Sequence, residues 1–391
     1  MNGAQRRTRR GATTGLMTRW LRCSLLMLAP AACFGGEGTL GAACERDADC
    51  GDEQSCQRQI CSLCGDGVAQ AGELCFEGPQ ASDAQPAGAP FVALVDVDGD
   101  AVLDLVWPAP GGLAVSTMSA DSFSAAQERP FDVTALWSGD IDGDGMAELL
   151  TRDASGGAAL WRPDSAGALL VVPELDLEPL RDLTDAVVHP DFGIVAQVGS
   201  TLVRVGLDRE PASVQLEGDV THLRASAGDG ASFGVVVVID GEALVPVLAA
   251  AEALEAQPAT ALPEPVLDVA TAAWNGDAFG DAAVLYDTGE VQVWLGNGGG
   301  GFVEGPGGAA LLSSERIAVL DANSDRFQDI LALGPESSIQ LLVRRGAELD
   351  DAIEFDATSA WWVAPLSLGS DRFADLILYD GTTISVLRSA P

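Results

Sequence analysis

A short acidic loop recurs along the chain and constrains its fold more than any other feature. The clearest copy, Asp140–Leu149, has acidic side chains at loop positions one, three, five and nine and glycines at four and six. Carboxylates crowded into one turn repel each other, by about 4 kcal/mol for a pair 4 Å apart at an effective dielectric of 20. Ca²⁺ accepts six to eight oxygen ligands and removes this repulsion. The loop therefore predicts a calcium site between two strands.

Two further copies keep almost the whole pattern, starting at Asp96 and Asp321. A β-turn that is merely rich in Asp and Gly is the alternative, but three copies in phase favour metal binding. We expect three structural Ca²⁺ sites. Their side-chain ligands are Asp96, Asp98, Asp100, Asp104, Asp140, Asp142, Asp144, Glu148, Asp321, Asn323, Asp325 and Asp329.

The spacing of the copies predicts the architecture. Two degenerate copies keep positions five and nine, as Asp277 with Asp281 and Asp371 with Asp375. Neighbouring copies start 44 to 48 residues apart, except across one gap that is three times as long. Two ligand-poor candidates fill this gap: Asp185–Gly193 and Ser226–Gly234. Seven such units, each with signals for short strands and Gly-marked turns, predict an all-β, seven-bladed β-propeller.

The last unit lacks a fourth strand, because its third strand, Thr382–Leu387, is followed by only four residues. Phe76–Pro79 is similar in sequence to Phe302–Pro306, the outer strand of the fifth unit. We expect residues near 74–80 to pair with the last blade and close the ring, which would cover two open sheet edges. Only Leu248–Ala256 has a pattern that allows a helical turn or two.

The loops resemble the FG-GAP/VCBS repeat, the integrin-α-like propeller unit, from about Phe91 to Leu387. An EF-hand requires Glu at the twelfth loop position and flanking helices, whereas Trp107, Thr151 and Ala332 stand there. The resemblance implies calcium ligands at positions one, three, five and nine, together with a main-chain carbonyl at position seven.

The N-terminal region has the features of an export signal. Residues 1–32 contain six arginines and a short apolar run that ends in small residues before Cys33. This segment resembles a lipoprotein signal, which implies lipidation of Cys33 and an outer-membrane or cell-surface location. Secretion after cleavage behind Ala32 is the alternative. Residues 33–43 read as a flexible tether.

A cysteine-rich segment, 44–78, follows the tether. An even number of cysteines in an exported chain predicts a disulfide framework; these are Cys44, Cys50, Cys56, Cys61, Cys64 and Cys75. Zinc binding by the Cys61–Cys64 pair is disfavoured, because the segment has no His. Cys64–Cys75 resembles the CGDG…GE.C disulfide modules of myxobacterial surface proteins. A linker is expected over 79–90 and the propeller over 91–391.

Composition limits the possible functions. A net charge of −37 and the absence of Lys argue against nucleic acid and anionic membrane surfaces as partners, so membrane contact is expected only through a lipid anchor. Only two histidines exist and no nucleophile motif is present, so no catalytic residue is assigned. We expect a monomeric binding module for an extracellular protein or glycan. The alternatives are a polysaccharide lyase or hydrolase on a propeller scaffold and a purely structural envelope lipoprotein.

Overall fold

The computed structural model describes Ser55–Gln57, Ile60–Ser62, Phe76 and residues 80–388 with gaps. The gaps are 83, 85, 87–88, 90, 101, 120–121, 165–167, 174, 208, 227–233, 250–252, 278, 308–313, 324, 335–338, 346–347, 350–351, 356–359, 361 and 367–374. The expected signal 1–32, the tether 33–43, Cys33 and four framework cysteines (Cys44, Cys50, Cys64 and Cys75) lie outside the described residues. Cys56 and Cys61 are backbone partners in the hairpin of β1 (Ser55–Gln57) and β2 (Ile60–Ser62).

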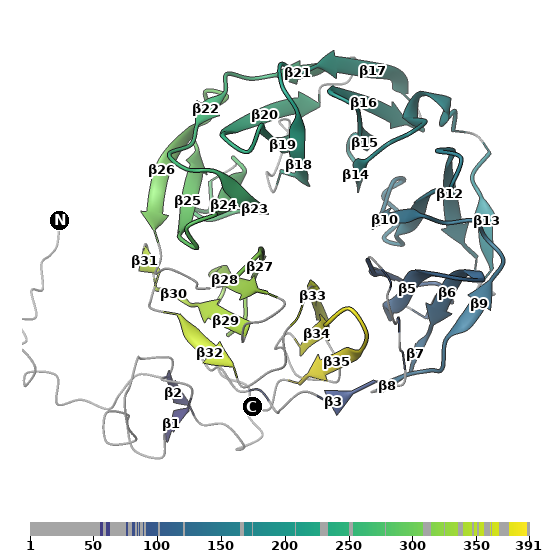
Figure 1. The fold of residues 1–391 in the computed structure, drawn as a ribbon, viewed down its shortest axis with the longest axis horizontal. Coiled ribbons are helices and arrows are strands. Elements are labelled where there is room, and N and C mark those ends of the chain that lie inside the picture. Colours follow the sequence, from purple (N-terminus) through teal and green to yellow (C-terminus); the bar gives the residue numbers. More distant parts are fainter. Residues whose placement is uncertain are drawn as a thin grey trace, which may run out of the picture.

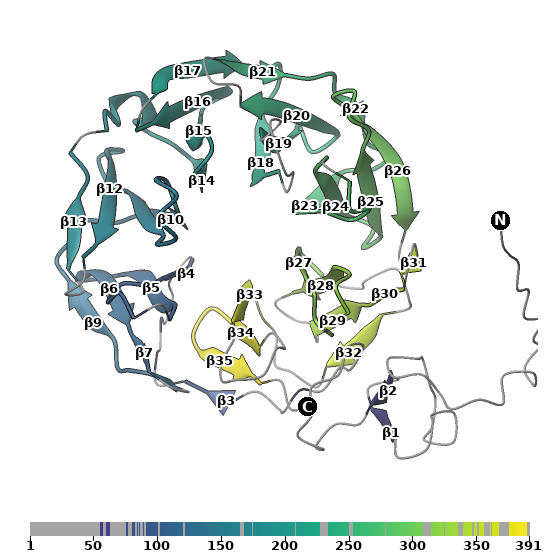
Figure 2. The same cartoon turned by 180° about the vertical axis from the view of Figure 1, so that it is seen from behind.

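Seven antiparallel sheets stand around a central axis, which confirms the predicted all-β, seven-bladed propeller (Figure 1). Figure 2 shows the same ring from behind, with the first strand of each blade innermost. Blades one to three are β4 (Ala93–Val95), β5 (Asp104–Ala109), β6 (Gly112–Ser116) and β9 (Gln127–Arg129); β10 (Ala135–Gly139), β11 (Glu148–Arg152), β12 (Ala158–Pro163) and β13 (Leu169–Val171); β14 (Asp185–His189), β15 (Gly193–Val198), β16 (Thr201–Gly206) and β17 (Arg209–Gln215).

The remaining blades complete the ring, and the seventh takes its outer strand from the N-terminal side of the propeller. Blades four to seven are β18 (Val220–Ala225), β19 (Gly234–Ile239), β20 (Ala243–Ala249) and β21 (Leu254–Ala256), with β22 (Thr260–Ala261) also paired to β20; β23 (Val266–Ala272), β24 (Asp281–Tyr286), β25 (Val291–Gly296) and β26 (Phe302–Gly307); β27 (Arg316–Leu320), β28 (Asp329–Leu333), β29 (Ile339–Leu342) and β32 (Ile353–Phe355); β33 (Trp362–Leu366), β34 (Asp375–Tyr379), β35 (Ile384–Leu387) and β3 (Gln80–Ala81).

Besides the β1–β2 hairpin, the described residues outside the blades form the hairpins of β7 (Met118–Ser119) with β8 (Ser122–Phe123) and of β30 (Arg344–Arg345) with β31 (Glu348–Leu349), and a 3-10 turn over Glu178–Leu180. The described residues contain no helix that is long and apolar enough to cross a membrane.

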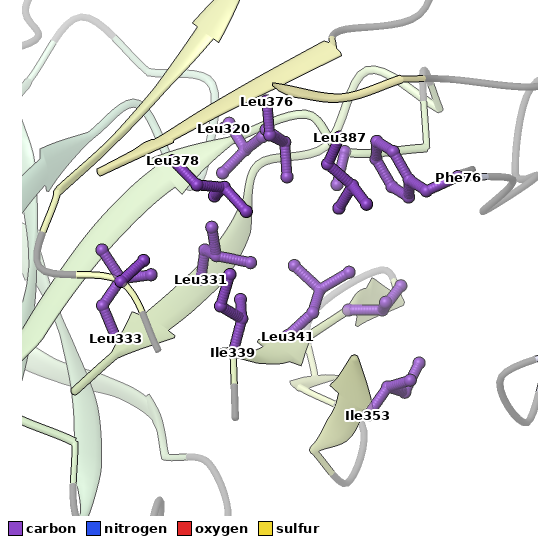
Figure 3. Packing of buried hydrophobic residues seen from close by; sticks show 13 residues of the cluster. Phe76, Leu320, Leu331, Leu333, Ile339, Leu341, Ile353, Leu376, Leu378 and Leu387 are labelled. Atoms are coloured by element: carbon purple, nitrogen blue, oxygen red, sulfur yellow. The ribbon is translucent and has the colours of Figure 1, made fainter. Parts of the chain in front are cut away.

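The second strands explain why the sheets pack as blades. Every residue of β19, β24, β28 and β34 is buried, because neighbouring blades cover both faces of each strand. A strand covered on both faces is apolar throughout rather than alternating. One such core lies between blades six and seven, where Leu331 and Leu341 face Leu376 and Leu378 (Figure 3).

Ring closure was predicted from the sequence and is confirmed. Gln80 and Ala81 pair antiparallel with Val386 and Ser385 of β35. Phe76 packs beside Leu387 in the core between blades six and seven (Figure 3). The closing strand therefore lies just after the Phe76–Pro79 match and inside the segment expected as a linker.

The chain after β3 also packs against the seventh blade. Ala84 and Ala89 are buried in a core that they share with Tyr379. The Tyr379 hydroxyl lies 2.8 Å from the carbonyl oxygens of both Pro86 and Ala89, and its single hydrogen is donated to one of them at a time. Closure thus combines strand pairing with apolar packing.

A chain of polar contacts, the inner belt, links the first strands of five consecutive blades. The Trp137 indole donates to Asp185 at 3.1 Å, and Arg224 reaches Asp185 at 3.7 Å and Asp268 at 2.9 Å. The second oxygen of Asp268 accepts the Ile317 main-chain N–H at 2.9 Å. Since Asp268 is buried, its pairing with Arg224 compensates a charge that would otherwise be costly.

Two features suggested by the sequence differ in the structure. In Leu248–Ala256, where the pattern allows a helical turn or two, the described residues Leu248–Ala249 and Leu254–Ala256 are paired strands of β20 and β21. Asp185–Gly193 is not a loop copy, because Asp185–His189 is the first strand of blade three and only a tight turn precedes β15.

Truncation tests the role of the closing segment. A protein comprising 76–391 keeps Phe76 and β3, whereas one comprising 85–391 loses both. We expect the shorter protein to melt at least about 5 °C lower in calorimetry, since it exposes an apolar core and the edge of β35. Equal melting temperatures would show that β3 contributes nothing to closure.

Candidate metal centre

The first acidic loop, between β4 and β5, gathers three carboxylates. Oxygen atoms of Asp96, Asp98 and Asp104 all lie within 4.8 Å of one another. Asp96 Oδ1 accepts the Gly99 N–H at 2.7 Å, and Gly99 has a φ of 78°, which favours glycine. Asp98 Oδ1 is buried with no hydrogen-bond partner. A buried, unpaired carboxylate oxygen within a carboxylate triad is a suitable ligand for a hard cation.

The second loop, between β10 and β11, repeats this gathering with one addition. Oxygens of Asp140, Asp142 and Glu148 lie within 4.8 Å of one another. Arg162, near the end of β12, contacts this triad: its Nε donates to Glu148 Oε1 at 3.0 Å and its Nη2 to Asp142 Oδ2 at 2.5 Å. Arg162 is not among the residues predicted from the loop pattern.

The third complete loop, between β27 and β28, is tied by its first and third residues. Asp321 accepts the N–H groups of Asp325 at 3.1 Å and Arg326 at 3.0 Å. The buried Asn323 side chain accepts the Asp325 N–H and donates to the Asp325 carboxylate, both at 3.2 Å. Arg326 stands at the sixth position with a φ of 73°, and Gly145 at the sixth position of the second loop also has a positive φ, of 91°.

Position five shapes the turn in all these loops. Asp100, Asp144, Asp325 and the degenerate-loop residue Asp277 each accept, at 2.8 Å, the N–H two residues further on. This is the Asx-turn geometry that Asp favours. Asp100 and Asp144 are not members of the two close triads, although their turn positions them at the loop edge.

Position nine holds the blade together, and we name its contacts the carboxylate brace. Asp104 accepts the Val97 N–H within its own loop and the Met118 N–H just beyond the third strand, both at 2.8 Å. Asp329 does the same with Ala322 at 3.0 Å and Arg344 at 2.8 Å. In blade two, the Arg162 side chain replaces the distant N–H, because Glu148 is one carbon longer. Each brace thus joins a loop to its third strand.

The brace persists where the other ligands are lost. Asp281, in the degenerate loop of blade five, accepts N–H groups from Trp274 at 2.6 Å, Asn275 at 3.2 Å and Gly296 at 2.8 Å. Asp375 is likewise buried at the start of β34, whereas Asp371 lies outside the described residues. An acid at position nine is therefore needed for these hydrogen bonds even in a loop that has lost position one, whether or not that loop binds metal.

Blades three and four have glycine at position nine. A Cβ at Gly193 would lie 2.4 Å from the Val205 carbonyl oxygen, and one at Gly234 would lie 2.2 Å from that of Val247. Here the third strand approaches too closely for any side chain. The two blades that lack the acid therefore close by direct backbone contact.

Burial makes ionisation of several loop carboxylates unfavourable. Desolvation raises the pKa of Asp104 to about 6 and that of Asp329 to about 8, despite the lowering effect of the donated N–H groups. Desolvation also raises the pKa of Glu148 and Asp98. A cation bound among these carboxylates would favour their ionised form, so the donor set and its electrostatics suit Ca²⁺.

A second arginine, Arg344, bridges two neighbouring loops. Its guanidinium donates to the Trp274 carbonyl and lies 4.9 Å from the Trp274 ring and 4.8 Å from the Phe327 ring. It therefore joins the loops of blades five and six by a hydrogen bond and cation–π contacts. An arginine 14 or 15 residues after position nine is the sequence signal that could have identified both Arg162 and Arg344.

Two cavities lie in the region of blades four and five. One, of about 450 Å³, is reached from the end of β24 remote from its acidic loop, and we name it the blade-five pocket. Its lining includes Glu264, Tyr286, Glu290, Gln292, Trp294 and Glu304. The other, of about 330 Å³, lies beside the glycine-rich turn 296–301 and the Phe279 ring.

Polar contacts order the walls of the blade-five pocket. The Trp294 indole donates to the Tyr286 hydroxyl at 2.9 Å, and the Gln292 amide donates to the Gly305 carbonyl at 2.7 Å. Burial raises the pKa of Tyr286, and the carboxylates of Glu290, Glu264 and Glu304 raise it further. Three acids thus lie close enough to this phenol to influence it.

Comparison with known proteins places the fold and nothing finer. No family model matches the chain, and no curated protein matches it significantly. A chain of the solved complex of BBS1N with ARL6DN, soaked with lead, matches with a TM-score of 0.56 and 11% identity, over 83% of this chain and 98% of that one. The mercury-soaked form matches with the same score and identity, over 81% and 97%. At this identity the likeness shows a shared β-propeller fold alone.

The brace predicts unequal effects within one degenerate loop. Asp281→Ala removes the acceptor for three N–H groups, those of the buried Trp274, the half-buried Gly296 and the exposed Asn275, and we expect the free energy of unfolding to fall by about 3 kcal/mol. Asp277→Ala, at the exposed fifth position, should cost less than about 1 kcal/mol. Urea unfolding with and without Ca²⁺ measures both. A loss at Asp281 that Ca²⁺ abolishes, or equal losses at both positions, would contradict the brace.

Proposed function

We propose that this protein is an exported, calcium-stabilised β-propeller that acts as a binding module at the cell surface. The support for export is the basic, apolar and small-residue pattern of residues 1–32. In this proposal Cys33 carries the lipid anchor, and the cysteine framework 44–78 connects it to the propeller. The propeller then presents its pockets to the outside of the cell.

Calcium has a structural role in this proposal. The observation that supports it best is the buried, unpartnered Asp98 oxygen within the triad of the first loop. The Asp104 and Asp329 carboxylates, whose pKa values burial raises, would be stabilised by the same ion. Asp96, Asp98 and Asp104 hold one ion, with Asp100 at the loop edge. Asp321, Asn323, Asp325 and Asp329 hold another.

The ligand in this proposal is a glycan bound in the blade-five pocket. Carboxylates and an amide can exchange hydrogen bonds with sugar hydroxyls, while Trp294 and Tyr286 supply apolar surface with polar tips. Glu290 and Glu304 are exposed and Glu264 is half-buried, so all three have some access to solvent. An extracellular protein is the alternative partner. Because three acids share the pocket, polysaccharide cleavage is the second candidate function.

Calcium addition tests the metal part of the proposal. With a dissociation constant near 10⁻⁴ M, 5 mM Ca²⁺ should stabilise the native state by about 2 kcal/mol per site. Melting temperature should therefore rise with Ca²⁺ and fall with chelator. Asp98→Asn should reduce the rise, whereas Asp277→Asn should leave it unchanged. A melting temperature that does not respond to chelator would contradict filled sites.

A glycan array tests the ligand. The full mature protein should bind a set of glycans, and the double substitution Glu290→Gln with Glu304→Gln should weaken binding about tenfold or more, since hydrogen bonds to charged groups contribute about 1.5–3 kcal/mol each. Glu255→Gln, on the outer strand of blade four, is the matched control. Release of shortened oligosaccharides would assign an enzyme instead. Absence of any glycan binding would contradict this ligand class.

A further inference from the structure

In the loop of blade two a cationic side chain of the protein, Arg162, contacts two carboxylates. We infer that the Arg162 guanidinium takes the place of Ca²⁺ in this loop, so that Asp140, Asp142 and Glu148 form no calcium site in the wild-type protein. This inference deepens the proposed function, since it rests on acidic loops of this type being able to hold Ca²⁺.

The contacts of Arg162 use the oxygens that a metal would need. Two of its nitrogens reach two different members of the triad, Glu148 at 3.0 Å and Asp142 at 2.5 Å. The Glu148 side chain is fully buried, and the Arg162 side chain retains 40% exposure. A planar guanidinium with several fixed donors suits two carboxylates better than a single point charge would.

The register of the repeat explains why the arginine reaches the triad. Glu148 stands at position nine, where Asp104, Asp281 and Asp329 use one oxygen to accept a main-chain N–H at the end of the third strand or just beyond it. Arg162 stands at the same distance along the chain as Met118 does in blade one. Its Nε replaces the N–H, and the rest of the guanidinium then extends to position three of the loop.

The first loop provides the contrast. Its position-three oxygen, Asp98 Oδ1, is buried with no hydrogen-bond partner, whereas the position-three carboxylate of blade two, Asp142, has the guanidinium at 2.5 Å. In both triads, ligand oxygens of all three carboxylates lie within 4.8 Å of one another. The carboxylates come together in both loops, but among the described residues only blade two has a cationic side chain in contact with a position-three oxygen. We therefore expect a metal in the first loop and none in the second.

The blades therefore differ in what neutralises their acidic loops. A guanidinium and Ca²⁺ compete for the same oxygens, and the fixed positive charge of Arg162 reduces the attraction of the loop for a second cation. The loop of blade two is therefore held by Arg162 without the ion. The loop of blade one, in which Asp98 Oδ1 has no hydrogen-bond partner, depends on the ion.

Calcium stoichiometry tests this inference directly. Equilibrium dialysis of the full mature protein against Ca²⁺ should show that Arg162→Gln binds one more ion per chain than the wild type. Arg181→Gln, which removes an exposed arginine paired with Glu178 at 3.6 Å, should bind the wild-type number. Arg162→Lys, which keeps a positive charge, should also bind the wild-type number. An unchanged stoichiometry in Arg162→Gln overturns the inference.

A second variant keeps the test decisive if Arg162→Gln does not fold. Asp142→Asn in the otherwise wild-type protein should leave the number of bound ions unchanged, and a loss of one ion overturns the inference. The proposed function fails separately. A wild type that binds no Ca²⁺, together with an Arg162→Gln protein that binds one ion, would contradict the sites of blades one and six and support the role of Arg162.

Discussion

The structure depends on a buried acid at the start of the second strand. In blades one, five and six this carboxylate accepts main-chain N–H groups from its own loop and from a residue at the end of the third strand or just beyond it. An unsatisfied buried N–H costs about 1–3 kcal/mol, so the acid must stay whether or not a metal binds. The calcium loops are thus built on a hydrogen-bonding device that has its own function.

The acidic loop combines two roles, the proposed cation binding and the bracing of strands, and the blades show that these roles can be separated. Positions one and three gather oxygens and vary among the blades, while position five shapes the turn. Position nine joins the triads of blades one and two and also ties the loop to the third strand. Blade five has Ala273 at position one and keeps Asp281, which is consistent with this separation. Blade two keeps all the acids, yet a guanidinium contacts two of them. An intact acidic motif is therefore insufficient grounds for assigning a metal.

The sequence predicted the architecture well, because the acids mark the same place in each blade. Asp96, Asp140 and Asp321 fixed the phase, and the apolar second strands followed from it. Asp185 was misassigned, because it has the residue type of a loop ligand but belongs to the inner belt. The apolar pattern of Leu248–Ala256 allows a helical turn, whereas Leu248–Ala249 and Leu254–Ala256 pair with each other as parts of β20 and β21.

The sequence predicted which carboxylates come together in the candidate site, but not which other side chains contact them. Spacing alone placed Asp98 and Asp142 at equivalent positions, and both do gather with their neighbours. No pattern predicted that Arg162 would reach one triad, since this depends on the extra carbon of Glu148 and on the length of the third strand. The blade-five pocket joins residues from two blades, and no local motif marks such a place.

The closing strand also affects how the ring can form during synthesis. Residue 80 is made before any blade, and its partner, residue 386, is made after six blades are complete. Contacts so distant in sequence form late, because the chain loses much entropy when it brings them together. Until the seventh blade forms, β3 has no strand partner and the ring of blades stays open. Folding of this propeller therefore ends with a single joining event between its earliest and latest parts.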